Sequence, residues 1–154
     1  MNTNKIVLLY TVFLNIFVSV VIAIIITPKY SVLFFVGNLA FLWLPQAITV
    51  GVVYLSTRKA SVSSGLASVL SLYLVIYFSW MVFCSQPAMA WVGYLFSLPG
   101  AGASAIIFSI YTKNKLWSYL KVTVASTVCA TLGIVINLIL VWYWLSDTWE
   151  ISCS

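Results

Sequence analysis

The sequence predicts an all-α integral membrane protein, a compact bundle of five transmembrane helices with short loops in a single domain, residues 1–154. Two observations predict this class. Hydrophobic residues make up 64% of the chain and charged residues only 6%, whereas a soluble domain carries about a quarter charged residues. Apolar runs of about 20 residues, long enough to cross a bilayer core as a helix, recur along the whole chain. We expect no soluble domain.

The first predicted helix covers residues 6–26. Its basic start, Met1 to Lys5, is typical of a signal peptide. However, the apolar run of about 21 residues exceeds the usual 7–15, and no A-x-A cleavage site precedes Pro28. We therefore expect this helix to remain in the mature protein.

Four further helices are predicted between polar breaks, at residues 32–55, 66–84, 88–111 and 116–145. The breaks are TPKYS, STRKASVSS, CSQPA and TKNK. Because all four are short, consecutive helices are expected to be antiparallel neighbours. The CSQPA break carries no charge, but without it residues 66–111 would form one helix of about 69 Å, longer than any bilayer core is thick.

The basic residues predict the orientation. With five spans, all but Lys29 fall on one side: Lys5, Arg58, Lys59, Lys113, Lys115 and Lys121. By the positive-inside rule the N-terminus is cytoplasmic and the C-terminus lies outside, as in a bacterial inner-membrane protein. The net charge of +5 is thus a topology signal and does not indicate nucleic-acid binding. The partner that these basic residues imply is the lipid bilayer, through its anionic headgroups.

The stretch GAGASA, Gly100 to Ala105, fits the fingerprint G-x-G-x-x-A of dinucleotide-binding proteins. That fingerprint requires a preceding strand and an acidic residue about 20 positions later. Neither is present, and the only carboxylates are Asp147 and Glu150. No nucleotide cofactor is expected.

Small residues at every fourth position predict faces on which helices pack closely. In the fourth helix they are Gly93, Ser97, Ala101, Ala105 and Ser109; in the fifth they are Ala125, Cys129 and Gly133. The two faces are natural partners for each other, although a homo-oligomer contact has the same pattern.

Two prolines, Pro45 and Pro99, fall near the middle of predicted helices, and Gly100 follows the second. Proline removes a backbone donor and kinks a helix. The segments VGNLAFLWLPQ and VGYLFSLP resemble each other, which suggests a parallel repeat. Some transporters bind substrate where two interrupted helices meet. The alternatives are a helix break that forms a site and a kink that only shapes packing.

Four amide side chains lie inside the predicted spans: Asn15, Asn38, Gln46 and Asn137. Asn15, Asn38 and Asn137 are expected in the outer half of the membrane, with Ser97 at a similar depth. Such a layer binds a polar solute or, more commonly, joins helices by hydrogen bonds. The sequence contains no histidine, and no carboxylate precedes Asp147, so neither an enzyme nor a metal site is expected.

Aromatic residues near the helix ends predict interfacial belts. At the end of the fifth helix they are Trp142, Tyr143, Trp144 and Trp149; near the CSQPA break they are Trp80, Trp91 and Tyr94.

The first hypothesis for function is a non-enzymatic membrane protein that acts through helix contacts with a membrane protein partner. In size and layout, though not in motif, the bundle is similar to bacterial immunity proteins that block pore-forming toxins and to small accessory subunits. The second hypothesis is a small oligomeric transporter or channel that uses Pro45 and Pro99. A lipid-modifying enzyme ranks third.

The last expectation concerns cysteines. Five spans place Cys84 and Cys153 on the outer side, where oxidising conditions favour a disulfide. Two free thiols are the alternative, because a disulfide requires a Cα separation below about 7 Å.

Overall fold

The computed structural model describes residues 3–27, 32–83, 90–113 and 117–145, and the part of the chain so described is helical throughout apart from the helix ends. The helices are α1 (Thr3–Ile26), α2 (Val32–Thr57), α3 (Ala60–Phe83), α4 (Ala90–Tyr111) and α5 (Tyr119–Leu145). All five are long and apolar enough to cross a membrane. The predicted all-helical class with five apolar helices is confirmed. Membrane insertion and orientation remain predictions.

The third helix begins earlier than predicted, at Ala60 instead of residue 66. Its first turns contain serines whose hydroxyls bond backward along the helix. Ser64 donates to the Ala60 carbonyl at 2.8 Å, and Ser68 donates to the Ser64 carbonyl at 3.0 Å. Because the Ser64 and Ser68 hydroxyls are bonded within the helix itself, these two serines do not mark a loop, whereas the buried Ser63 hydroxyl has no hydrogen-bond partner among the described residues.

The connection between α2 and α3 is therefore only two residues, Arg58 and Lys59. Arg58 has a φ of 53°, in the left-handed region, and its N–H donates to the Tyr54 carbonyl at 2.8 Å. A residue in this conformation ends a helix sharply. The Lys59 ammonium donates to the Ser109 carbonyl at 3.2 Å, near the C-terminus of α4, where the helix dipole favours a positive charge.

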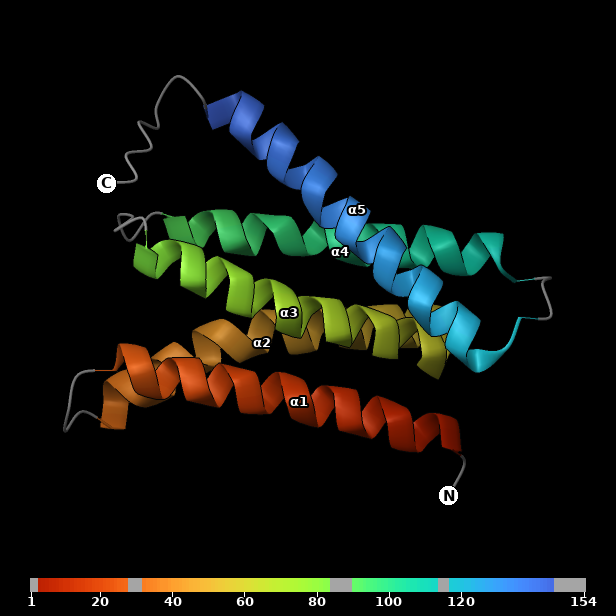
Figure 1. Ribbon diagram of the computed structural model, residues 1–154, viewed down its shortest axis with the longest axis horizontal. Helices are drawn as coiled ribbons and strands as arrows, with labels where there is room; N and C mark the ends of the chain where they lie inside the picture. The colour runs from red at the N-terminus through yellow and green to blue at the C-terminus, as the bar shows by residue number, and fades with distance from the viewer. Residues whose placement is uncertain (1–2, 28–31, 84–89, 114–116, 146–154) are drawn as a thin grey trace.

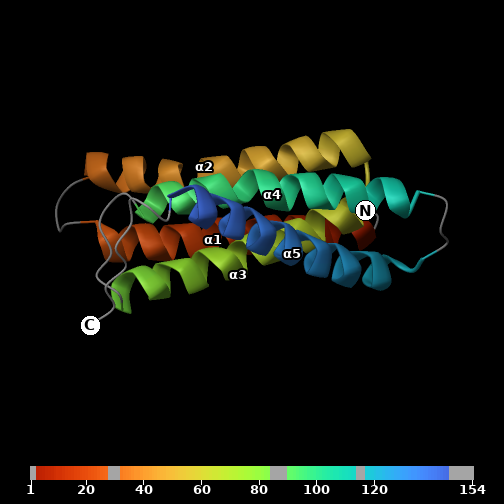
Figure 2. The ribbon, with the colours of Figure 1, turned by 90° about the horizontal axis from the view of Figure 1, so that it is seen from above.

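The five helices form a bundle in which α3 is central (Figures 1 and 2). It contacts each of the other four helices, and residues 62–67 along its first turns are all buried. Helices α2 and α4 lie side by side, while α1 packs mainly on α3. Helix α5 crosses α3 and α4 obliquely, and its C-terminal half diverges from the bundle (Figure 1).

Glycines allow α5 to approach its neighbours closely. A Cβ atom added to Gly100 of α4 would lie 2.5 Å from the carbonyl oxygen of Gly133 in α5, and one on Gly133 would overlap the Gly100 carbonyl. On the other side of α5, a Cβ on Gly65 of α3 would lie 2.6 Å from the Thr123 carbonyl oxygen. Backbone therefore packs directly on backbone at both crossings.

The small-residue face predicted on α4 is buried. Near the start of α4, however, this face packs against α3 through Gly93. Its members Gly93, Ser97, Ala101, Ala105 and Ser109 are all buried. A Cβ on Gly93 would lie 3.1 Å from the Tyr77 hydroxyl of α3. Helix α5 instead meets α4 through Gly100 and Ser104, each one residue before a member of the expected face. In α5 itself, Gly133 is buried and Ala125 is half-buried.

Alternating helix directions bring basic residues to one end of the bundle, the right-hand end in Figure 1, here called the basic end. The residues of known placement there are Arg58, Lys59, Lys113 and Lys121. We expect this end to be cytoplasmic, because positively charged loops resist translocation.

The orientation is testable with fusions to a reporter that is active only in the cytoplasm. Fusions at the N-terminus, after Lys59 and after Lys115 are expected to be active, and a fusion at residue 154 inactive. Activity at both chain ends would contradict the orientation and the number of crossings.

Candidate functional site

Polar side chains from four helices meet in the middle of the bundle. Asn15 of α1 donates through its amide nitrogen to the Gln46 side-chain oxygen of α2 and, at 3.2 Å, to the Ser71 hydroxyl of α3. The Gln46 amide nitrogen donates in turn to the Tyr94 hydroxyl of α4. Each of these four side chains is at least 96% buried. We call Asn15, Gln46, Ser71 and Tyr94 the polar network.

The polar network is anchored beside the first proline. Pro45 cannot donate a backbone hydrogen bond and its ring crowds the preceding turn, which makes nearby carbonyls accessible. The Leu42 carbonyl, three residues before Pro45, accepts from the Gln46 amide at 3.1 Å and from the Tyr94 hydroxyl at 3.4 Å. These side chains therefore supply donors to the backbone at the proline turn.

A corresponding arrangement occurs at the second proline. The Phe96 carbonyl, three residues before Pro99, accepts from the Asn137 amide nitrogen of α5. Both α2 and α4 continue as helix through their prolines. Pro45 and Pro99 with Gly100 therefore lie inside continuous helices, and whether they kink these helices stays a prediction. Neighbouring side chains bond to the disturbed turns, as proline-containing membrane helices require.

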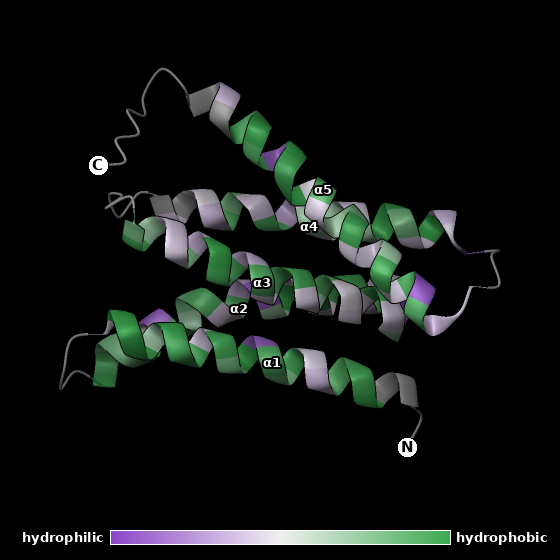
Figure 3. Cartoon of the chain, in the orientation of Figure 1, coloured by the Kyte–Doolittle hydropathy of each residue, from purple (hydrophilic) through white to green (hydrophobic). Residues whose placement is uncertain are grey.

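The four amides do not form one hydrogen-bonded cluster. Asn15 and Gln46 bond to each other, whereas Asn38 donates to the Thr27 hydroxyl at 3.1 Å and Asn137 bonds to α4. In Figure 3 the hydrophilic positions appear as separate spots on otherwise apolar helices. Ser97 donates to the Tyr94 carbonyl of its own helix at 2.6 Å. The amides therefore belong to three separate hydrogen-bonded sites, and the common depth of Asn15, Asn38 and Asn137 in the membrane stays a prediction.

Aromatic rings surround Tyr94 on the side away from Gln46. The Tyr73 ring stacks on the Tyr94 ring with centroids 5.7 Å apart, and Tyr77 and Trp91 lie 5.7 and 6.1 Å away. Tyr94 is fully buried, so its assignment to an interfacial belt is wrong. Trp91 and Trp80, also assigned to the belt, are half-buried, and their rings pack on Tyr77.

Sequence reasoning missed Tyr94 and Ser71 as members of the polar network. The spacing of Tyr94 near a helix end resembles that of a belt residue, and Ser71 is one of several serines in α3. A usable signal was that a buried glutamine needs several partners from other helices.

The polar network is a set of neutral donors and acceptors, most of which bond to one another. Both amide nitrogens have two acceptors each, and the Gln46 oxygen accepts from Asn15. Within the described ranges, no three histidine, cysteine, aspartate or glutamate side chains gather to bind a metal ion. The arrangement is suited to holding four helices in register.

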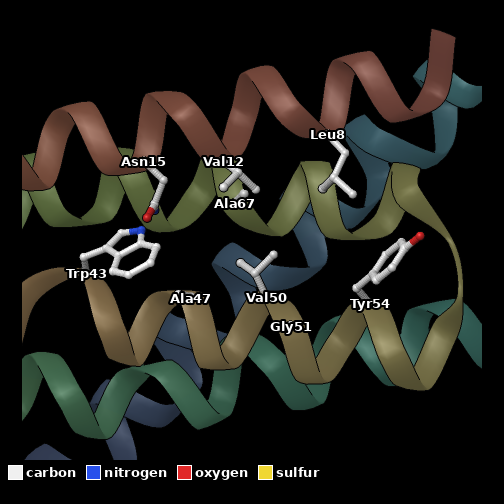
Figure 4. A pocket seen from close by; sticks show the side chains of 9 residues that line it. All are labelled: Leu8, Val12, Asn15, Trp43, Ala47, Val50, Gly51, Tyr54 and Ala67. Carbon is white, nitrogen blue, oxygen red and sulfur yellow. The ribbon is translucent and has the colours of Figure 1, made fainter. Parts of the chain in front are cut away.

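A groove opens beside the polar network, between α1 and α2 with α3 as its floor (Figure 4). Its volume is about 230 Å³. Asn15 and Trp43 lie at one end, and Leu8 and Tyr54 lie at the other (Figure 4). The remaining lining residues are Val12, Ala47, Val50, Gly51 and Ala67. Apart from Asn15 and the tips of two aromatic rings, the walls are apolar.

The cysteines predicted to form a disulfide, Cys84 and Cys153, lie outside the described residues, so that bond remains a prediction. Cys129 in α5 is a half-buried free thiol.

Comparison with known proteins gives no further assignment. No protein-family model matches the chain, and no curated protein or solved structure is detectably similar to it.

Proposed function

We propose that this chain is a non-enzymatic membrane protein that acts through contacts between its helices and those of a membrane protein partner, in the manner of an immunity protein or an accessory subunit. The observation that carries the proposal is the divergence of α5. Its C-terminal half leaves the bundle (Figure 1) and exposes a stripe of large apolar side chains. They are Leu132, Ile136, Ile139, Leu140 and Tyr143.

The spacing of this stripe, which we call the α5 stripe, is that of one helix face, with positions three or four apart. Gly133 and Asn137, in the same stretch of helix, contact α4, so the stripe is a different face of that stretch. A helix that diverges in this way has surface free for helices of another protein. The hydrogen bonds of the polar network, by contrast, run between its own members and to the Leu42 carbonyl, which supports a structural role for its amides.

The proposal predicts site-specific crosslinking from the α5 stripe. A photoreactive amino acid at Ile136 or Ile139 is expected to crosslink a heterologous membrane protein in native membranes. The same amino acid at Phe13 or Phe17 of α1, which are also exposed, is the matched control. Adducts of equal yield from both helices, or adducts with lipid alone, would contradict a specific partner surface on α5.

A second candidate, a small oligomeric transporter or channel, rests on a different observation. The two proline-containing helices pack side by side, with Gly102 of α4 against Thr49 of α2, where an added Cβ would lie 3.2 Å from the Thr49 methyl carbon. Solute or ion flux through liposomes that is abolished by Asn15→Leu or Gln46→Leu, in protein that remains folded, would favour this candidate over the first.

A further inference from the structure

We propose that the groove between α1 and α2 binds one acyl chain of an anionic phospholipid, with the headgroup at the basic end of the bundle. The proposal assumes that the helices span a membrane, but it does not depend on a protein partner. Length, width, wall chemistry and charge each support this occupant.

The groove is as long as one leaflet. From Trp43 to Tyr54 it follows α2 for eleven residues, or about 16 Å at the helical rise. Half of a typical hydrocarbon core is about 15 Å. One end lies at Asn15, in the polar network midway along α1, and the other end lies beside the last turn of α2. A chain that enters from the basic end would therefore end near the middle of the membrane.

The groove is too narrow for a helix. The groove holds about 230 Å³, whereas a helical segment of the same length, about 10 Å across, occupies roughly 1,200 Å³. A second copy of this chain, or a helix of another protein, can cover the groove but cannot occupy it. A single extended hydrocarbon chain is much thinner than a helix and would lie in the groove with its outer side facing the membrane.

The walls are suited to an acyl chain. The side chains of Val12, Val50 and Ala67 consist only of carbon and hydrogen. Ala47 and Gly51 have little or no side chain, which leaves space beside α2. A Cβ added to Gly51 would have no neighbour within 4 Å, so the space beside this glycine is open. Hydrocarbon in this space would contact apolar side chains along its whole length.

Charge at the open end favours an anionic headgroup. Tyr54 marks that end of the groove, and Arg58 follows one turn later with an exposed side chain. The Arg58 guanidinium suits a phosphate, to which it can donate two parallel hydrogen bonds. Lys5 is in α1 less than one turn before Leu8, which lines the same end. No acidic residue occurs before Asp147, so none of the described residues at this end carries a negative charge that would repel a phosphate.

The first test compares lipid retention by purified, delipidated protein in mild detergent. After incubation with phosphatidylglycerol or phosphatidylcholine, native mass spectrometry counts the lipids that stay bound. Wild type is expected to retain one phosphatidylglycerol, with a preference over phosphatidylcholine of about fivefold that Arg58→Asn removes. Asparagine is chosen because it tolerates the positive φ of this position. No retained lipid, or an unchanged preference in Arg58→Asn, would overturn the proposal.

The second test fills the groove. Gly51→Leu and Ala47→Leu are each expected to lower retention about tenfold or more, because the new side chain takes the place of several methylene groups. Gly37→Leu is the matched control: it is in the same helix, is also without a neighbour within 4 Å of an added Cβ, and lies outside the groove. Circular dichroism and gel filtration establish which variants fold.

Wild-type retention in either groove variant that folds would overturn the proposal. So would a dimer that Gly51→Leu dissociates, since this face would then bind a second copy instead of a lipid. If neither groove variant folds, the comparison of headgroup preference between wild type and Arg58→Asn decides whether the proposal holds. Because the purified protein is used alone, failure of the crosslinking experiment on α5 would leave this result unaffected.

Discussion

Replacement of Gly133 by valine is expected to separate α5 from α4 and to lower the free energy of unfolding by about 3 kcal/mol. Gly133 is buried, and any Cβ at this position would overlap the Gly100 carbonyl oxygen and crowd Ser104 of α4. Backbone cannot move aside as a flexible side chain can, so the helices must move apart. Separation would also remove the hydrogen bond from Asn137 to the Phe96 carbonyl.

The effect is measurable as reversible unfolding of purified protein in mixed micelles of mild detergent and sodium dodecyl sulfate. Gly100→Ala is expected to act in the same direction, because its Cβ would lie 2.5 Å from the Gly133 carbonyl oxygen. Gly37→Val is the control, since an added Cβ there meets nothing within 4 Å. Equal unfolding curves for Gly133→Val and Gly37→Val would show that α4 and α5 do not pack as described.

Replacement of Gln46 by leucine is expected to cost about 2 kcal/mol of stability. The glutamine makes three hydrogen bonds, with Asn15, Tyr94 and the Leu42 carbonyl. Hydrogen bonds between membrane helices contribute about 0.6 kcal/mol on average and at most about 1.7. Leucine is similar in size, so the loss arises mainly from polar atoms of Asn15 and Tyr94 that remain buried without this partner.

A double-mutant cycle separates the pair from the rest of the polar network. Asn15→Leu with Gln46→Leu is expected to cost less than the sum of the single variants, because each single change leaves the other amide without its partner. Asn38→Leu is the comparison, since Asn38 is half-buried and, in the bonds described, donates only to Thr27. We expect this variant to lower the free energy of unfolding by about 0.6 kcal/mol. If the changes in the free energy of unfolding caused by Asn15→Leu and Gln46→Leu are strictly additive, Asn15 and Gln46 are not directly bonded.

The prediction of five helices succeeds because of a local requirement. In a bilayer each backbone polar group must be bonded within its own segment, so an apolar run of about 20 residues has little choice but to be a helix. The bounds of α1, α2 and α4 accordingly lie within about three residues of those expected. The error at the start of α3 has a local cause as well, since Ser64, which was assigned to the loop, bonds to the carbonyl of Ala60 in its own helix.

The hydrogen-bond partners in the polar network could not be predicted in this way. That Asn15, Gln46 and Asn137 are costly in a membrane follows from residue type alone, and each indeed has a hydrogen-bond partner. Their partners do not follow, because Asn15 and Gln46 are 31 positions apart, and Gln46 and Tyr94 are 48 apart. Tyr94 was assigned to the membrane interface because distance along the helix was the only evidence for its depth.

The sequence by itself determined the helical class, the number of apolar helices and the positions that must find polar partners, since these depend on composition and on the backbone of one segment at a time. Only the tertiary structure decided that Gly133 meets Gly100, that Tyr94 points inward to Gln46, and that α5 diverges from the bundle. Lipid is as apolar as the helix surfaces, so hydropathy does not distinguish a face that packs from a face that touches lipid. That choice depends on the fit between small residues and carbonyls on different helices, which exists only once the helices are assembled.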